Sequence, residues 1–198
     1  MTDKYAGYEG EYKDGKRHGK GKQIDDEGDI YEGEFLNDQY NGKGRMDYTD
    51  GDIYDGDWKE GIAHGKGVMI YSNGDKYEGD FKDGDIHGSG TMTYTNGNKY
   101  IGEFDGGNRH GQGKTTFANP QGFYEGNYRN NKRDGKGILK MGDDPVIEGY
   151  FENGDYIGKE PKPLNETDED IKINIPTESN INPDNKPKLT YKEILNKL

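Results

Sequence analysis

The chain contains no cysteine, so disulfide bonds and cysteine-ligated zinc are excluded. Hydrophobic residues make up only 27% of the 198 residues. No apolar run approaches the roughly 20 residues that a transmembrane helix needs, and residues 1–10 lack the apolar segment of a signal peptide. These absences lead us to expect a cytoplasmic protein rather than a secreted or membrane-spanning one.

The chain also lacks an excess of basic residues. Its formal net charge is -12, and residues 1–158 hold 20 basic and 31 acidic residues. Proteins that bind nucleic acid usually carry a basic patch or stripe that meets the phosphates. The charge balance therefore predicts no nucleic-acid partner.

Low hydrophobicity and a high net charge are typical of disordered chains, but the aromatic content contradicts that interpretation here. The sequence has 16 tyrosines, 6 phenylalanines and 1 tryptophan. Disordered segments are poor in aromatic residues, and most of these aromatics recur at a fixed spacing. The composition therefore predicts a folded array whose core is thin.

An aromatic-x-Gly-x-aromatic motif recurs every 23 residues, with one step of 24. Its central glycines are Gly10, Gly33, Gly56, Gly79, Gly102, Gly126 and, in a degraded copy that starts at Ile147, Gly149. A constant period of this length indicates a repeat architecture. We therefore expect seven structural repeats over residues 5–158.

Each repeat contains two turn signals, such as Asp83-Gly84 after the aromatic motif and Asn73-Gly74 at the end of a unit. Asp-Gly and Asn-Gly supply the positive φ angles of two-residue hairpin turns. Two turns per repeat predict two antiparallel strands. The fold class we expect is therefore all-β, an elongated single-layer antiparallel meander.

Alternation within the strands predicts one apolar and one polar face. Tyr54, Gly56 and Trp58 fall on one face, and Asp55 and Asp57 fall on the other. Glycines between the rings either let a ring lie across the backbone or let the strand coil strongly. Two strands advance the sheet by about 9.6 Å per repeat.

The Tyr-x-Gly-x-aromatic motif, a turn and then His-Gly-x-Gly or a close variant resembles the MORN repeat (membrane occupation and recognition nexus). The resemblance covers residues 5–158, and the last copy departs from it because Ile147 replaces tyrosine and Glu160 replaces the second glycine. It implies an all-β array of hairpins. It also implies a scaffold, since family members occur in junctional membrane proteins and cytoskeletal structures and beside enzyme domains.

No residue pattern predicts catalysis, a metal site or a cofactor. Four histidines occupy equivalent repeat positions, and they are His18, His64, His87 and His110. At about 9.6 Å per repeat they cannot share one zinc ion, whose ligands lie about 2.0–2.1 Å away. Residues 107–115 resemble a phosphate-binding loop, but Asn108 stands where its first glycine belongs. Acidic turns such as residues 25–29 lack the glutamate that an EF-hand loop requires at position twelve.

The leading functional hypothesis is a non-catalytic scaffold that binds a protein partner, a peptide or a helix, through the aromatic face. A single-layer sheet has no second layer, so part of that face can stay open to a partner. Tyrosine and tryptophan are frequent at binding hot spots. The candidate groove residues are Tyr48, Trp58, Tyr71, Phe81, Tyr94 and Phe117.

The alternative function is a module that binds anionic phospholipid at a membrane surface or tethers the chain to the cytoskeleton. Anionic leaflets attract basic clusters by about 1 kcal/mol per Lys or Arg, which disfavours an acidic array. Basic residues nevertheless recur beside the His-Gly position and predict a basic edge. They are Arg17, Lys20, Lys43, Lys66, Arg109, Arg133 and Lys136.

After residue 158 the period stops. Residues 159–187 contain five prolines and read as an extended polar linker. Residues 188–198 predict a short amphipathic helix with one apolar stripe of Tyr191, Ile194, Leu195 and Leu198. Because so short a helix is marginal alone, it either docks on the array, binds a partner or stays disordered. An edge-to-edge homodimer of the sheet is a further alternative.

Overall fold

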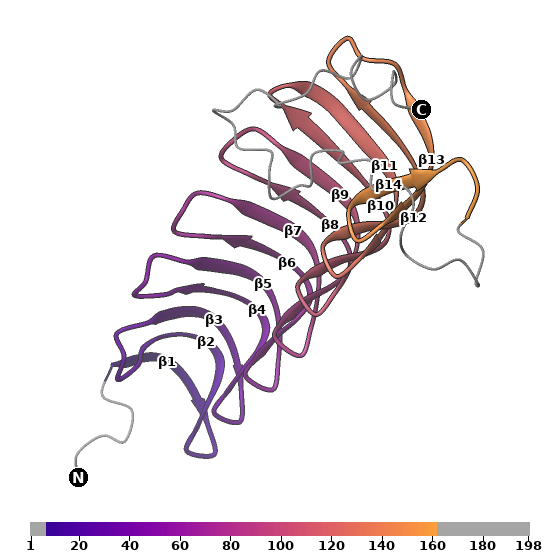
Figure 1. Ribbon diagram of the computed structural model, residues 1–198. Helices are drawn as coiled ribbons and strands as arrows, with labels where there is room; N and C mark the ends of the chain where they lie inside the picture. Colours follow the sequence, from indigo (N-terminus) through magenta and orange to yellow (C-terminus); the bar gives the residue numbers. More distant parts are fainter. Residues whose placement is uncertain (1–6, 162–198) are drawn as a thin grey trace. The chain divides into compact units, whose positions relative to one another are not determined.

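The computed structural model describes residues 7–161, which form one open antiparallel sheet (Figure 1). Within these residues the sheet has fourteen strands, and the order of the strands in the sheet is their order in the chain. The predicted meander of seven two-stranded repeats is therefore confirmed. The predicted linker and terminal helix lie outside the described residues, apart from the first positions of the linker.

Seven first strands carry the aromatic motif and alternate with seven second strands. In chain order the strands are β1 (Tyr8–Lys13), β2 (Lys16–Ile24), β3 (Ile30–Leu36), β4 (Gln39–Asp47), β5 (Ile53–Lys59), β6 (Ile62–Ile70), β7 (Lys76–Lys82), β8 (Asp85–Thr93), β9 (Lys99–Asp105), β10 (Asn108–Ala118), β11 (Gln121–Arg129), β12 (Lys132–Met141), β13 (Ile147–Glu152) and β14 (Asp155–Gly158). The chain divides into two compact units between Thr95 and Asn96.

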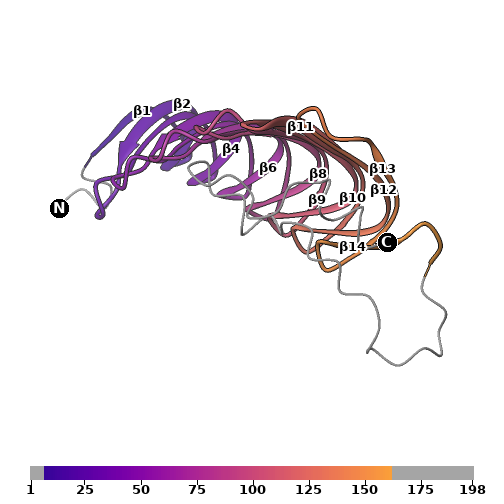
Figure 2. The same ribbon diagram turned by 45° about the horizontal axis from the view of Figure 1, so that its top comes forward.

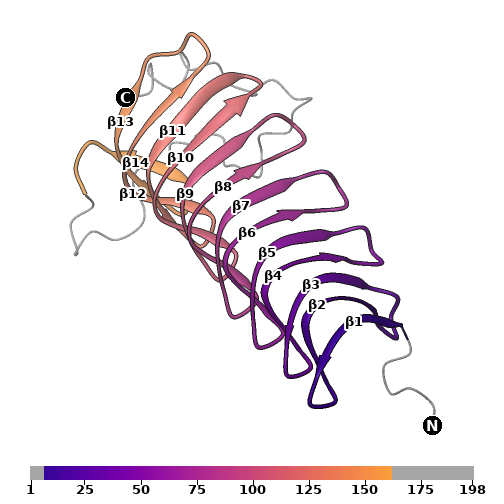
Figure 3. The same cartoon turned by 180° about the vertical axis from the view of Figure 1, so that it is seen from behind.

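In each unit the strands lie side by side, and the long strands bend along their length (Figures 2 and 3). The hairpin turns have the backbone that the sequence predicts. Between β3 and β4, Asn37 and Asp38 have φ angles of 51° and 73°, and between β5 and β6, Glu60 and Gly61 have 52° and 86°. Two successive left-handed residues are typical of the type I′ turn, whose twist matches that of the flanking strands.

The core is a layer of aromatic rings on one face of the sheet, which we call the aromatic face. Tyr31, Tyr54 and Tyr77 are 0% exposed, and the second aromatic of each of these repeats is nearly as buried. Rings within a repeat meet edge to face, as Tyr54 and Trp58 do at 5.1 Å and 85°. Rings of successive repeats also meet, as Tyr54 and Phe81 do at 4.8 Å. Such pairs stabilise the fold beyond the area that they bury.

A row of glycines runs beneath these rings, one glycine per strand. Gly33 pairs with Gly44 across β3 and β4, and the Tyr31 ring lies on both. A Cβ atom added at Gly44 would lie 2.2 Å from the Tyr31 hydroxyl oxygen and 2.4 Å from its Cζ. Of the two roles that the sequence allowed for these glycines, the structure therefore shows that the ring lies across the backbone.

In the first six second strands a bulge lies between the glycine pair and the hairpin turn. Between Gly33 and Phe35 the register shifts, and the backbone N–H of Lys43 donates to the Glu34 carboxylate at 3.1 Å. The Tyr31 hydroxyl donates to the carbonyl oxygen of Glu34 at 2.9 Å. The Asp57 and Asp80 carboxylates accept the equivalent hydrogen bonds from the backbone N–H groups of Lys66 and Ser89, each at 2.9 Å. In the second, third and fourth repeats each bulge thus has a carboxylate on one side and a phenol on the other. These groups satisfy backbone groups that the ladder leaves unpaired.

Candidate functional site

Three tyrosines of the predicted groove form a row on the aromatic face of the first unit. Tyr48, Tyr71 and Tyr94 each follow a second strand directly, and each is half-buried. The other three predicted residues are core residues, since Trp58, Phe81 and Phe117 are 6%, 4% and 3% exposed. We correct the prediction accordingly: these three rings support the sheet, and the Tyr48, Tyr71, Tyr94 row supplies the accessible aromatic surface.

Burial is the main cause that raises the pKa of Tyr71, followed by the charge of Asp52, the neighbouring Tyr94 and Asp75. Burial also raises the pKa of Tyr48, with acidic turn residues as the further cause. The phenols of Tyr48 and Tyr71 therefore stay protonated at neutral pH. Each presents a flat apolar ring together with a polar hydroxyl group.

The loops that carry the tyrosine row are fixed to one another from repeat to repeat. The backbone N–H of Ser72 donates to Asp52 at 2.8 Å, and that of Thr95 donates to Asp75 at 2.8 Å. Inside the turn, the Tyr71 N–H donates to the Asp75 carbonyl oxygen at 2.9 Å. These bonds hold successive tyrosines of the row in equivalent positions.

The surface beside this row is apolar and half-buried, and the predicted groove did not include it. Tyr40 stacks on Tyr31 with ring centroids 3.8 Å apart, and its hydroxyl reaches Gln23 at 3.3 Å. Met69 and Met92 are half-buried on the same face. The register was the missing signal for Tyr40, because the bulge lies between the Phe35–Tyr40 pair and the Gly33–Gly44 pair.

The predicted basic edge does not exist as one surface, because its members lie on opposite faces. Arg17 and Arg133 are 8% and 1% exposed and lie on the aromatic face. The Arg17 guanidinium lies 5.2 Å from the Phe35 ring centroid, and that of Arg133 lies 5.4 Å from the Phe151 centroid. Arg109 lies in the same way 5.2 Å from the Tyr128 centroid. The arginines are therefore packing residues.

The lysines of that edge lie on the opposite, polar face beside carboxylates. Lys43 is 2.6 Å from Asp57, Lys66 is 2.6 Å from Asp80, and Lys136 is 3.7 Å from Glu148. The predicted edge placed both residue types together because it ignored the alternation of side chains along the strand. Arg17 and Lys20 are three residues apart, and an odd spacing on a strand places side chains on opposite faces.

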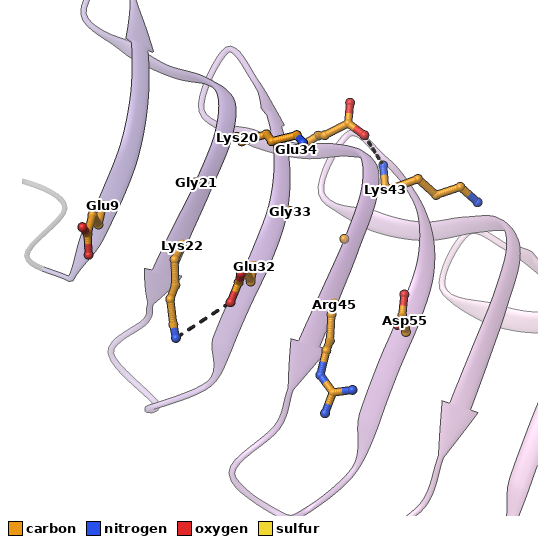
Figure 4. Close-up of a pocket in the computed structure, with 11 residues that line it drawn as sticks. Glu9, Lys20, Gly21, Lys22, Glu32, Gly33, Glu34, Lys43, Arg45 and Asp55 are labelled. Atoms are coloured by element: carbon orange, nitrogen blue, oxygen red, sulfur yellow. Dashed lines mark hydrogen bonds and ion pairs between the residues drawn. The ribbon is translucent and has the colours of Figure 1, made fainter.

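A shallow depression on the polar face displays this charge pattern (Figure 4). Its charged lining residues alternate in sign from strand to strand: Glu9 on β1, Lys20 and Lys22 on β2, Glu32 and Glu34 on β3, Lys43 and Arg45 on β4, and Asp55 on β5. Glycines of the central row form its floor. Because opposite charges neighbour each other, the depression has no strong preference for an anion or a cation.

These ion pairs predict a dependence of stability on pH. A hydrogen bond from Lys66, with a second one from the Ser89 backbone, lowers the pKa of Asp80 despite its partial burial. A lowered folded-state pKa contributes stability above the ordinary carboxyl pKa, and this stability is lost as the pH falls through the folded-state value.

We therefore expect the wild type to lose unfolding free energy below about pH 4, and Asp80→Asn to lose less of it over the same range. Urea titrations at several pH values measure this difference. Asp85→Asn, an exposed site on β8, controls for the removal of one charge. Parallel acid profiles for wild type and Asp80→Asn would contradict the assignment.

Within residues 7–161, no group of three or more His, Cys, Asp or Glu side chains is arranged to hold a metal ion. In the same residues, no helix has the length and apolar character needed to cross a bilayer. The predicted docking residues of the tail, Tyr191, Ile194, Leu195 and Leu198, lie outside the described residues.

Comparison with solved structures returns similar chains of low identity. The TCP10c domain of Drosophila melanogaster Sas-4 is 15% identical, with a TM-score of 0.37, 67% of this chain covered and 86% of the other. The TCP domain of SAS-4 from the same organism, in complex with a proline-rich motif of Ana2, is 14% identical with a TM-score of 0.31, and 67% and 84% are covered. At these TM-scores the structural similarity gives no indication of this chain's function.

A search of curated protein sequences returned no match. The sequence model of the MORN repeat matches six consecutive segments, which are residues 8–30, 31–53, 54–76, 77–99, 100–119 and 124–144. Each segment begins at the first tyrosine of the aromatic motif, within the first strand of a hairpin, and β13 and β14 form the next hairpin in the same order. The matches span more than half of the sequence, so the chain belongs to the MORN repeat family.

Proposed function

We propose that this protein is a non-catalytic scaffold that binds the apolar side of an amphipathic helix of a protein partner. The observation that carries the proposal is the row of half-buried Tyr48, Tyr71 and Tyr94, repeated in the same environment on the aromatic face. Half-buried tyrosines offer contact area at low entropic cost because the fold already restrains their rings. The repeat family supports a binding role rather than chemistry.

A helix suits this row because the spacings agree. Successive repeats advance by about 9.6 Å, and two turns of an α-helix advance by about 10.8 Å. A helix that crosses the strands can therefore place one apolar residue in each repeat. Met69 and Met92 beside the row add flexible apolar surface, which adapts to different side chains.

The negative charge of the turns beside the tyrosine row favours a partner helix with basic residues next to its apolar stripe. The turn carboxylates Asp52 and Asp75 lie close enough to Tyr71 to raise its pKa. Basic residues that border the apolar stripe of a partner helix would meet these carboxylates. The membrane-surface alternative has less support, because Lys43 and Lys66 are already ion-paired with carboxylates of the sheet.

The test is a pull-down from the native cell with wild type and the double variant Tyr71→Ala, Tyr94→Ala. We expect the double variant to lose at least about 90% of partner recovery, since two hot-spot residues each contribute about 2 kcal/mol or more. Ile70→Ala is the matched control, because Ile70 is 38% exposed on the polar face. It should recover as much partner as wild type.

Thermal unfolding by circular dichroism must show that the double variant is folded at the assay temperature. Equal recovery by wild type and a folded double variant would refute binding through the tyrosine row. Helical content of the recovered partner segment, measured as a peptide with and without the chain, separates a helix from an extended peptide.

A further inference from the structure

The first repeat exposes a ring that every other repeat of its unit buries. Tyr12 is 50% exposed, whereas the equivalent Phe35, Trp58 and Phe81 are 3%, 6% and 4% exposed. In the described part of the chain β1 pairs with β2 alone, so its outer side has no strand from a preceding repeat. The difference in exposure is the part of this ring that the preceding repeat covers in the other three repeats.

The junction between the first two repeats shows how such a strand covers the ring. The Tyr8 ring centroid lies 5.0 Å from that of Phe35, and the Arg17 guanidinium lies 5.2 Å from it. On the polar face, Lys20 pairs in register with Glu34 and Lys22 with Glu32. The last strand of the preceding repeat, here β2, thus supplies an arginine on one face and two lysines on the other.

The junction between the sixth and seventh repeats, in the second unit, has the same kinds of contact. The Arg133 guanidinium lies 5.4 Å from the Phe151 centroid and donates to the Gly154 carbonyl oxygen at 2.6 Å. The N–H of Gly154 donates back to the Arg133 carbonyl oxygen at 2.9 Å. The ion pair between Lys136 and Glu148 completes the junction on the polar face.

The first repeat carries the receiving half of this junction. Glu9 and Glu11 stand where Glu32 and Glu34 stand in the second repeat, Tyr12 stands in the place of Phe35, and the exposed Gly15 stands in the place of Gly154. The receiving groups are therefore two carboxylates, a ring and a turn glycine, all on β1 and its hairpin turn.

The backbone of β1 is oriented to receive a strand as well. The carbonyl oxygen of Gly7 accepts from the N–H of Ile24 on β2 at 3.0 Å. Backbone groups alternate in direction along a strand, so those of Tyr8 and Gly10 point away from β2. Edge groups that no strand within residues 7–161 pairs with are a template for another strand.

We propose that the outer edge of β1 binds an extended segment of another protein that adds an antiparallel strand and carries the pattern Arg-x-x-Lys-x-Lys, or the same with Arg for Lys. Its arginine stacks on Tyr12 and donates to the Gly15 carbonyl oxygen, as Arg133 does at Gly154. Its two lysines lie opposite Glu11 and Glu9. The template for this pattern is Arg17, Lys20 and Lys22 of β2.

A second copy of this chain fits the edge poorly. Pairing β1 with another β1 would bring Glu9 and Glu11 against carboxylates, which disfavours the pair. The last second strand of another copy has Tyr156 where the arginine is needed, Glu160 where Gly21 stands and Pro161 where Lys22 stands. Proline cannot donate to a sheet ladder. The charge of the edge therefore points to a basic segment from a different protein.

The probe is a fluorescently labelled peptide with the sequence of residues 16–24, KRHGKGKQI, titrated with the full chain and followed by anisotropy. We expect saturable binding that high salt weakens. Replacing Lys20→Glu and Lys22→Glu in the peptide should abolish binding. Arg17→Ala in the peptide should weaken it about 3-fold through loss of the cation–ring contact.

In the protein, Tyr12→Ala should weaken peptide binding about 3-fold and Glu9→Gln about 2- to 5-fold. Glu32→Gln is the matched control, because Glu32 occupies the same position within an internal junction and lies between Lys22 and Arg45. This control should bind the peptide as wild type does. Equal weakening by Glu32→Gln would overturn the assignment to β1.

Amide hydrogen exchange identifies where the peptide binds on the chain, independently of its affinity. The bound peptide should slow exchange at Tyr8, Gly10 and Gly15 relative to the free chain. Protection elsewhere, or no binding at millimolar peptide, would overturn the proposal. So would sedimentation that shows a dimer of wild type that Tyr12→Ala dissociates, because the occupant of the edge would then be a second copy.

Discussion

Gly44→Val is expected to lower the free energy of unfolding by about 3 kcal/mol, the upper end of the cost of overpacking a closely packed core. The added Cβ would lie 2.2 Å from the Tyr31 hydroxyl oxygen and 2.4 Å from its Cζ. The ring cannot easily move, because its hydroxyl donates to the Glu34 carbonyl oxygen at 2.9 Å and it packs against Phe35 at 5.1 Å. Urea unfolding followed by tyrosine fluorescence measures the change.

Gly61→Asn is the control for this glycine. Gly61 has a φ of 86°, and a Cβ added there would meet nothing within 4 Å. Asp38 and Asn131 already hold this turn position with φ angles of 73° and 69°. We therefore expect a loss below about 0.5 kcal/mol, typical of a surface substitution. A loss at Gly44→Val as small as that of the control would show that the ring does not press on the glycine row.

The repeat period made most of the fold predictable. Asp-Gly and Asn-Gly pairs located the turns, and alternation around Tyr54 and Trp58 separated the two faces. These signals are local, because each depends on residues that are neighbours in one hairpin. The fourteen strands and their order follow directly from them.

The candidate site was predicted less well than the fold. Arg17 and Lys20 were placed on one edge, although residues three apart on a strand face opposite sides, so alternation alone could have separated the arginine from the lysine. Burial was also misjudged for Trp58, since its indole N–H donates to the Gly44 carbonyl oxygen of the preceding repeat at 2.9 Å. No motif within one repeat reveals a bond of this kind.

Tyr54→Ala is expected to lower the free energy of unfolding by about 4 kcal/mol, near the cost of removing a fully buried aromatic side chain. Tyr54 is 0% exposed, meets Trp58 at 5.1 Å and Phe81 at 4.8 Å, and lies on Gly56 and Gly67. Its loss opens a cavity that the glycines cannot fill. Unfolding in urea at neutral pH measures the cost.

Two further variants separate the contributions of the Tyr54 side chain. Tyr54→Phe removes only the hydroxyl that donates to the Asp57 carbonyl oxygen at 2.8 Å, and it should cost about 1 kcal/mol. Tyr12→Ala removes the equivalent of Trp58 from the first repeat, where the ring is 50% exposed, so it should cost less than Tyr54→Ala. If Tyr54→Phe cost as much as Tyr54→Ala, the hydrogen bond that closes the bulge, rather than ring packing, would be the main source of stability in each repeat.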